Sequence, residues 1–167
     1  MRKIDTIKQQ IDRLDIIPDQ AREEYAEHIA LPWTTSVNNL IYNFVTARQA
    51  FSIIQGEVIP DKDLREHFRV RDFHRASHEV LAIVQHQEPM SDTHIARVHR
   101  TLMWNLDIAE AGEIDPRIHD LIDRVNQEDS YHPVDQAAIL YGELWKSVTI
   151  AESAMMANLL VVLSPQG

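Results

Sequence analysis

The chain has 167 residues, of which 44% are hydrophobic, and this is enough to bury the core of one domain. It contains no cysteine, which excludes disulfide bonds, thiolate metal sites and cysteine nucleophiles, and this is typical of a reducing compartment. A formal net charge of -10, spread over the whole length, disfavours nucleic acid and anionic lipid surfaces as direct partners.

The N-terminal residues are charged where a signal peptide requires an apolar run. No apolar stretch approaches the roughly 20 residues that would span a bilayer. From these two features we expect a cytoplasmic protein that does not enter the membrane.

The first third of the chain predicts three helices. Apolar residues recur every three or four positions over residues 4–14, which indicates a helix that ends before Pro18. A second helix is expected over residues 19–30. A third begins after Pro32 and ends near Gly56, because glycine commonly terminates a helix.

The rest of the chain also reads as helical. A fourth helix is expected over residues 61–86, and a fifth follows a cap at Ser91 or Asp92 and runs to about residue 109. Asp115-Pro116 opens a short sixth helix, and an apolar stretch covers residues 132–163. Since no segment alternates as a strand would, the sequence predicts an all-α single compact domain of about seven helices.

Several short motifs follow one another in a fixed order. The first lies within residues 33–48, the second is the run Leu64-Arg65-Glu66-His67, and the third covers residues 98–103. A last piece, residues 132–138, reads HPVDQAA. The positions in register within and just after the first motif are Trp33, Thr34, Asn38, Asn43, Thr46, Arg48, Gly56 and Lys62. Together these pieces resemble the Fic (Fido-fold) family, whose members typically transfer AMP.

The resemblance covers nearly all of the chain and implies a fold. It implies a single Fic-like helical domain over residues 1–167, with an N-terminal helical hairpin over residues 1–31 and a Fic-like core over residues 32–167. In this register HPVDQAA resembles the motif that opens the central Fic helix. The run LREH implies a structural role for His67.

The segment that carries Fic catalysis departs from the family pattern. A working member resembles H-P-F-x-D-G-N-G-R-x-x-R, in which the histidine acts as a general base, the acidic residue holds a cation and the turn cradles phosphate. Between Tyr141 and Asn158 this chain is several residues shorter and has no histidine, no arginine and no glycine after Gly142. The backbone cradle for an anion cannot be formed by these residues.

Two further family features are missing. The inhibitory motif, which ends in a glutamate and a glycine or asparagine, falls on residues 37–42 and places Ile41 and Tyr42 at those two positions. The flap that holds a target peptide has no room in the short interval between Gly112 and His132. We therefore expect an inactive pseudoenzyme with no cofactor, which acts through a protein partner as a regulator or as an assembly subunit.

Other functions remain open as alternatives. One is an enzyme with relocated nucleotide- or metal-dependent transferase chemistry, and another is a structural homo-oligomer. His67, Arg71, His74 and His78 follow one stripe of the fourth helix and are candidates for a polar site. His74 and His78 could ligate zinc if a carboxylate such as Asp72 or Glu79, or one on a neighbouring helix, approached them. Against this, Arg71 would repel a cation, and we expect no metal.

Two weaker signals lie in the C-terminal half of the chain. The doublet His119-Asp120 occurs in HD-type phosphohydrolases, but the other histidines are not spaced to complete that set. Met155, Met156 and Trp145 form a candidate patch for contact with a partner, although such residues more often fill a core. Trp104 is expected in the core.

Overall fold

The computed structural model describes residues 19–86, 91–105, 138–143 and 150–160, together with positions 6, 10, 120, 123, 135 and 162. These residues are helical or lie in turns and connections, and they contain no strand, as the all-α prediction requires. Five helices have defined bounds, and residues 138–143 are helical as well. The predicted helices over residues 4–14 and from Asp115 lie almost wholly outside the described residues.

The helix α2, Asp19–Leu40, runs through Pro32 as one element of 22 residues. The predicted break at this proline is therefore wrong, and the boundary after residue 31 falls inside a helix. Proline removes one hydrogen bond, but packing of the following turn against α4 offsets that loss. Trp33 meets Phe73 edge to face, with ring centroids 5.6 Å apart, and Thr34 is fully buried.

The predicted third helix is also divided, because α2 ends at Leu40 and Tyr42 turns the chain away from it. This residue has a φ of 63°, the left-handed conformation that usually requires glycine. The amide of Tyr42 donates to the carbonyl of Asn39 at 3.2 Å, and the amide of Asn43 donates to the carbonyl of Asn38 at 2.9 Å. These two bonds form a Schellman motif, which satisfies the last carbonyls of the helix.

A short helix, α3, covers Ala47–Ile54 and begins at a capping box. The Thr46 side chain accepts from the Gln49 amide, and the Gln49 side chain accepts from the Thr46 amide at 2.9 Å. The helix ends before Gly56, whose φ is 90°, so the predicted end at this glycine is confirmed. Sequence reasoning overlooked the Thr46 and Gln49 pair, although its T-x-x-Q spacing is a recognisable start signal.

The two central helices follow their sequence signals closely. The helix α4, Leu64–Gln85, starts three residues later than predicted because Asp63, and not Asp61, forms the cap with Glu66. The helix α5, Asp92–Met103, has Ser91 as its cap and ends earlier than predicted. Near the C-terminus, α8 covers Ile150–Leu160.

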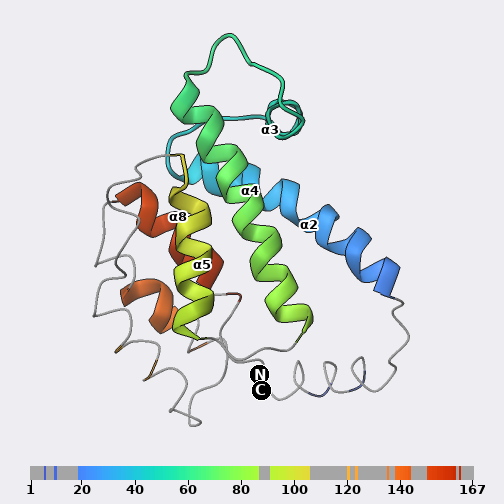
Figure 1. Cartoon of the computed structure of the whole chain (residues 1–167), viewed down its shortest axis with the longest axis vertical. Helices are drawn as coiled ribbons and strands as arrows, with labels where there is room; N and C mark the ends of the chain where they lie inside the picture. Colours follow the sequence, from blue (N-terminus) through green and yellow to red (C-terminus); the bar gives the residue numbers. More distant parts are fainter. Residues whose placement is uncertain are drawn as a thin grey trace.

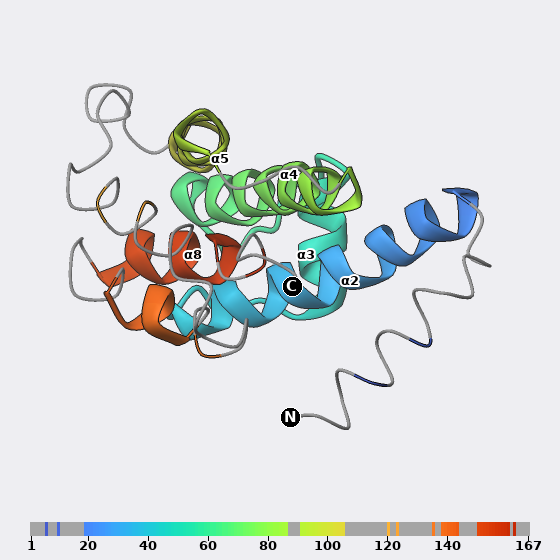
Figure 2. The same cartoon turned by 90° about the horizontal axis from the view of Figure 1, so that it is seen from below.

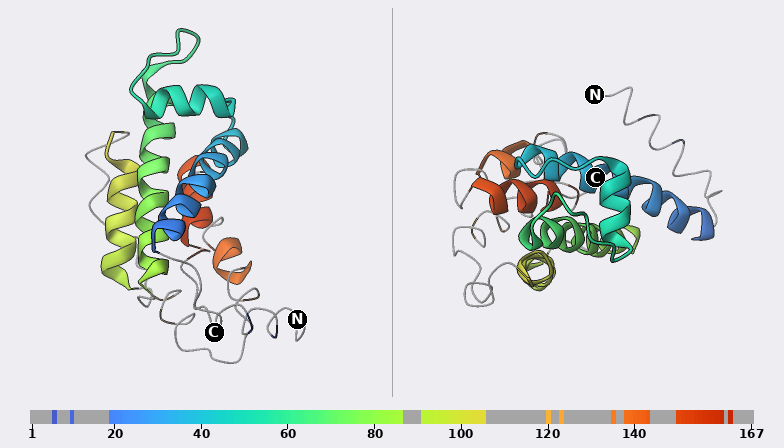
Figure 3. Two further views of the ribbon diagram at one scale, coloured as in Figure 1. Left: turned by 90° about the vertical axis from the view of Figure 1, so that its right-hand side faces the viewer. Right: turned by 90° about the horizontal axis from the view of Figure 1, so that it is seen from above.

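These helices form layers around α4. Figure 1 shows α4 at the centre with α5 running back alongside it, and Figure 2 shows α2 and α8 on the opposite side of α4. Figure 3 shows α3 crossing the end of α4 where that helix begins. No helix among the described residues is both long enough and apolar enough to cross a membrane.

The main core lies where α2, α4, α5 and α8 meet. Phe73, Ile95 and Leu102 are fully buried there, and a smaller cluster around Ile53 and Val70 joins α3 to α4. Trp104, in contrast, is 59% exposed, so the expectation that it belongs to the core is wrong. It follows the last residue of α5, at the point where the helix leaves the packed layers.

Candidate functional site

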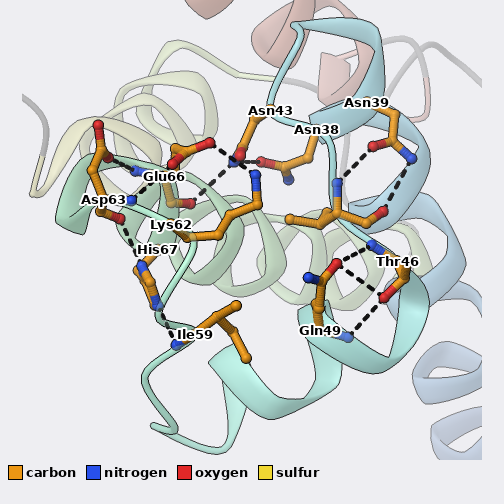
Figure 4. Close-up of polar contacts among 11 residues, drawn as sticks. Asn38, Asn39, Asn43, Thr46, Gln49, Ile59, Lys62, Asp63, Glu66 and His67 are labelled. Atoms are coloured by element: carbon orange, nitrogen blue, oxygen red, sulfur yellow. Dashed lines mark hydrogen bonds and ion pairs between the residues drawn. The ribbon is translucent and has the colours of Figure 1, made fainter.

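The stripe of His67, Arg71, His74 and His78 begins in a rigid corner at the start of α4. His67 is buried, and both of its ring nitrogens have backbone partners (Figure 4). Its Nδ1 lies 2.6 Å from the carbonyl of Asp63, and its Nε2 lies 2.9 Å from the amide nitrogen of Ile59. The ring therefore donates through Nδ1 and accepts through Nε2, which leaves no nitrogen for a ligand.

The same corner is tied to the end of α2 by side-chain amides. The buried Asn43 donates to the Asn38 side chain at 2.8 Å and to the carbonyl of Glu66 at 3.0 Å (Figure 4). Lys62 forms an ion pair with Glu66 at 2.8 Å. Hydrogen bonds from Lys62 and from the Asp63 amide lower the pKa of Glu66. These contacts fix the first turn of α4 in place.

Arg71 lies beyond this corner and lines a surface hollow of about 200 Å³. Ile53, Val58, Lys62 and His67 line the same hollow, and most of the residues that border it are apolar or basic. Arg71 therefore lines the same hollow as His67 and the loop that follows α3. Glu57 is the one carboxylate among the described residues of this lining, which contain no carboxylate pair and no hydroxyl nucleophile.

The other half of the stripe faces a different element. His74 and His78 lie one turn apart on α4, with their rings 4.6 Å apart at an interplanar angle of 80° and their Nε2 atoms 3.2 Å apart. Glu27 comes from α2, and its Oε1 lies 3.6 Å from the Nε2 of His78. One ligand atom from each of the three residues lies within 4.8 Å of the other two. Two imidazoles and a carboxylate therefore converge on one point.

The ring of His74 is oriented from the other side by Thr34. The Thr34 hydroxyl donates to the carbonyl of Ala30 at 2.7 Å, so its proton is directed along α2. The Nδ1 of His74 lies 3.5 Å from the same hydroxyl oxygen, a long contact in which only the ring can donate. This arrangement favours a proton on Nδ1 and leaves the lone pair of Nε2 directed at His78.

The charge state of His74 is set mainly by its surroundings. Burial lowers the pKa of His74, the neighbouring His78 lowers it further, and Glu27 acts in the opposite direction. Desolvation disfavours the protonated ring, so His74 is neutral near pH 7. Burial also lowers the pKa of His99 on α5.

The carboxylates that the sequence suggested for this pair have other partners. Asp72 is fully buried and accepts from Asn105 at 2.8 Å and 3.1 Å, and burial raises its pKa. Glu79 accepts from the Thr101 hydroxyl at 2.7 Å. The sequence also allowed a carboxylate from a neighbouring helix, and Glu27 on α2 is such a residue. No local signal identifies Glu27, because its position depends on how α2 crosses α4.

The end of α2 carries an exposed aromatic pair. Tyr42 and Phe44 are 79% and 65% exposed, and their rings meet edge to face with centroids 6.2 Å apart. Leu40, just before them, is 49% exposed. Ile41 between them is buried in the main core. We call Leu40, Tyr42 and Phe44 the aromatic corner.

The predicted patch near the C-terminus is placed only in part. Met155 and Met156 are 1% and 6% exposed and pack in the main core, so they offer almost no surface to a partner. Trp145 lies outside the described residues, as do His119 and residues 144–149. Among the described residues, exposed large apolar side chains occur at the aromatic corner and also elsewhere, for example at Phe51, Val58 and Leu64.

Comparisons with known proteins provide no relative for this chain. No protein-family model, curated protein or solved structure matches it.

Proposed function

We propose that this chain is a catalytically inactive relative of Fic proteins that acts by contacting another protein. The observation that carries the proposal is the conformation of Tyr42. In the Fic register this residue stands where the family has glycine or asparagine, and it adopts the positive φ that those two residues favour. Ile41 replaces the inhibitory glutamate and is buried in the core.

The loss of catalysis is inferred from the residues themselves. A phosphate cradle needs backbone that tolerates positive φ and close approach, and the segment between Tyr141 and Asn158 has glycine only at position 142. A buried isoleucine at position 41 is consistent with this loss, because an inhibitory carboxylate has no role without an arginine to restrain.

The aromatic corner is the surface that supports a protein partner. Aromatic side chains are enriched at the centres of protein interfaces, because they bury a large area at a small cost in side-chain entropy. Tyr42 keeps a left-handed backbone that costs an L-residue about 1–2 kcal/mol relative to glycine. A bulky exposed side chain at a strained position is consistent with selection for contact and not for stability. The occupant we favour is a different protein with an apolar face.

Two measurements on the full chain test this proposal. Calorimetric titration with ATP and Mg²⁺ should show no binding, and incubation with labelled ATP should label no protein. Micromolar binding or transferred label would overturn the inactive assignment and favour relocated transferase chemistry.

The partner is tested with matched surface variants. The double variant Tyr42→Asn with Phe44→Ser keeps a residue that tolerates positive φ, and Phe51→Ser removes an aromatic ring that is also exposed, at 53%, but lies on α3. A partner captured by the native chain should then be purified and titrated. We expect the double variant to bind at least about 30-fold more weakly, since hot-spot truncations cost about 2 kcal/mol or more, and Phe51→Ser to bind as the native chain does.

Equal binding by the native chain and the double variant would exclude the aromatic corner. Light scattering tests whether a second copy of this chain, and not a different protein, occupies the aromatic corner. A dimer of the native chain that the double variant abolishes would identify a second copy as the partner and support the structural homo-oligomer instead.

A further inference from the structure

Glu27, His74 and His78 are brought together by the crossing of two helices. Spacing of four residues places the two histidines on one face of α4, and α2 passes that face (Figures 1 and 2). The side chains of Glu27 and His78 are 71% and 33% exposed, whereas His74 is half-buried. An ion from solvent can therefore reach the three ligand atoms, and the exposed side of the cluster can hold water.

Two of the three separations between ligand atoms match those that one metal ion requires, and the third, between Glu27 and His74, is within 4.8 Å. Zinc binds imidazole nitrogen at about 2.0–2.1 Å, so two such ligands at a tetrahedral angle lie about 3.3 Å apart. The Nε2 atoms of His74 and His78 are 3.2 Å apart. Carboxylate oxygen binds zinc at nearly the same length, and the Glu27 oxygen is 3.6 Å from the Nε2 of His78. The three ligand atoms need little movement to surround an ion.

Two nitrogen lone pairs at 3.2 Å repel each other. Without an ion, the Nε2 atoms of His74 and His78 must therefore share a proton in a hydrogen bond. The Thr34 contact places the proton of His74 on Nδ1, so the shared proton belongs to the Nε2 of His78. That proton lies near the Glu27 carboxylate as well. An ion replaces it at the same place, and the His78 ring that binds the ion through Nε2 carries its proton on Nδ1. Outer contacts such as the one from Thr34 orient imidazole ligands in metal sites generally.

We propose that Glu27, His74 and His78 form a binding site for a divalent transition-metal ion of the zinc class. Two imidazole nitrogens and one carboxylate oxygen suit Zn²⁺, Co²⁺ or Ni²⁺, whereas Mg²⁺ prefers oxygen ligands alone. The remaining coordination position is filled by water. The ion links α2 to α4 at a point where their side chains are otherwise partly exposed.

The test is a titration of the chelator-treated full chain with Zn²⁺, and with Co²⁺ read by its visible absorption. We expect one ion per chain, an absorption intensity typical of four-coordinate Co²⁺, and no competition from Mg²⁺. His74→Gln, His78→Gln and Glu27→Gln should each weaken binding by about 100-fold or more, because loss of an outer-shell partner alone costs about 10–100-fold. Thr34→Val, which keeps shape and removes the acceptor for Nδ1, should weaken it by about tenfold.

Two exposed histidines serve as matched controls, because the chain has nine histidines and surface imidazoles bind metals weakly. His28 lies next to Glu27 on α2, and His86 lies at the end of α4. The control variants are His28→Asn and His86→Asn. Both should bind as the native chain does, and circular dichroism should show that every variant keeps its helix content.

Three results would overturn the site. The first is a native chain that binds Zn²⁺ no more tightly than the double variant His74→Gln with His78→Gln. The second is a loss of Zn²⁺ affinity in His28→Asn equal to the loss in the ligand variants. The third is displacement of the bound ion by Mg²⁺. Absence of ATP binding would not affect this result, so the site and the proposed function fail independently.

Discussion

The two halves of α4 carry histidines on the same stripe, but the elements opposite them give these residues different roles. At the first turn, the loop before α4 presents a backbone carbonyl and a backbone amide, and His67 bonds to both. Two turns later α2 lies opposite, and it presents the side chain of Glu27 to His74 and His78. A histidine between backbone groups holds the fold together, whereas histidines that face each other and a carboxylate keep nitrogens for a ligand.

The largest effect expected from this contrast is stabilisation by metal. An ion that binds only the folded chain adds about 2.7 kcal/mol to the free energy of unfolding at a concentration 100 times its dissociation constant. Urea unfolding with and without Zn²⁺ should show this gain for the native chain and almost none for His78→Gln. A similar gain in His78→Gln would mean that zinc stabilises the chain elsewhere.

The next effect concerns the first turn. His67→Ala leaves the Ile59 amide without its acceptor and removes a buried ring, so the free energy of unfolding should fall by about 2 kcal/mol. His86→Ala is the control, because its exposed ring makes one contact, to the Ala82 carbonyl, and should cost less than about 0.5 kcal/mol. Equal losses in urea unfolding would contradict a special structural role for His67.

A smaller effect should appear as a dependence on pH. The folded pKa of His74 lies below its ordinary value of 6.5, so its contribution to stability is fully present above that value and is lost as the pH falls through the folded pKa. His99 acts in the same direction. The raised pKa of Asp72 acts oppositely, since its folded form gains stability as the pH falls towards 3.8.

The variant His74→Gln separates the contribution of His74 to the pH dependence of stability from those of His99 and Asp72. Between about pH 7.5 and about pH 5.5, the free energy of unfolding should fall less steeply in the variant than in the native chain, and His99 should account for part of the remaining slope. The native chain must be metal-free in this comparison, because protons and metal ions compete for the same nitrogens. An unchanged slope would show that His74 does not couple to folding.

The smallest effect lies at the end of α2. Tyr42→Gly relieves a left-handed tyrosine and keeps both Schellman hydrogen bonds. Because glycine loses more backbone freedom on folding, part of the relieved strain is offset, and thermal unfolding should show a net stability gain of about 0.5–1 kcal/mol. The same variant should bind the proposed partner less tightly, because the aromatic corner has lost one ring. A loss of stability would mean that packing of Tyr42 on Phe44 outweighs the strain.

How much the sequence could predict depends on whether its signals were local. The caps at Asp63 and Ser91 and the end at Gly56 follow from residues a few positions apart, and these helix ends were predicted to within three residues. The continuity of α2 through Pro32 was not predictable in this way. It depends on Trp33 and Thr34 packing against a helix that lies 40 residues further along the chain.

The candidate site follows the same division. The spacing of His74 and His78 marked the pair from sequence alone, whereas the third residue was open to any carboxylate that the fold placed nearby. Asp72 and Glu79 are close in sequence, but they are bonded to Asn105 and Thr101 on the opposite side of α4. Only the crossing of α2 over α4 identifies Glu27. The exposure of Trp104 likewise depends on packing that no periodicity encodes, whereas the burial of Met155 agrees with the expectation that such residues more often fill a core.

The contrast between the two halves of α4 is tested most directly by the ring nitrogens themselves. A long-range ¹H–¹⁵N spectrum of the full chain reports the protonation and coordination of each histidine ring. With one equivalent of Zn²⁺, the Nε2 resonances of His74 and His78 should shift together, while His67 should keep its proton on Nδ1 and its resonances should not move. A shift of His67, or the absence of any shift at His74 and His78, would contradict the account.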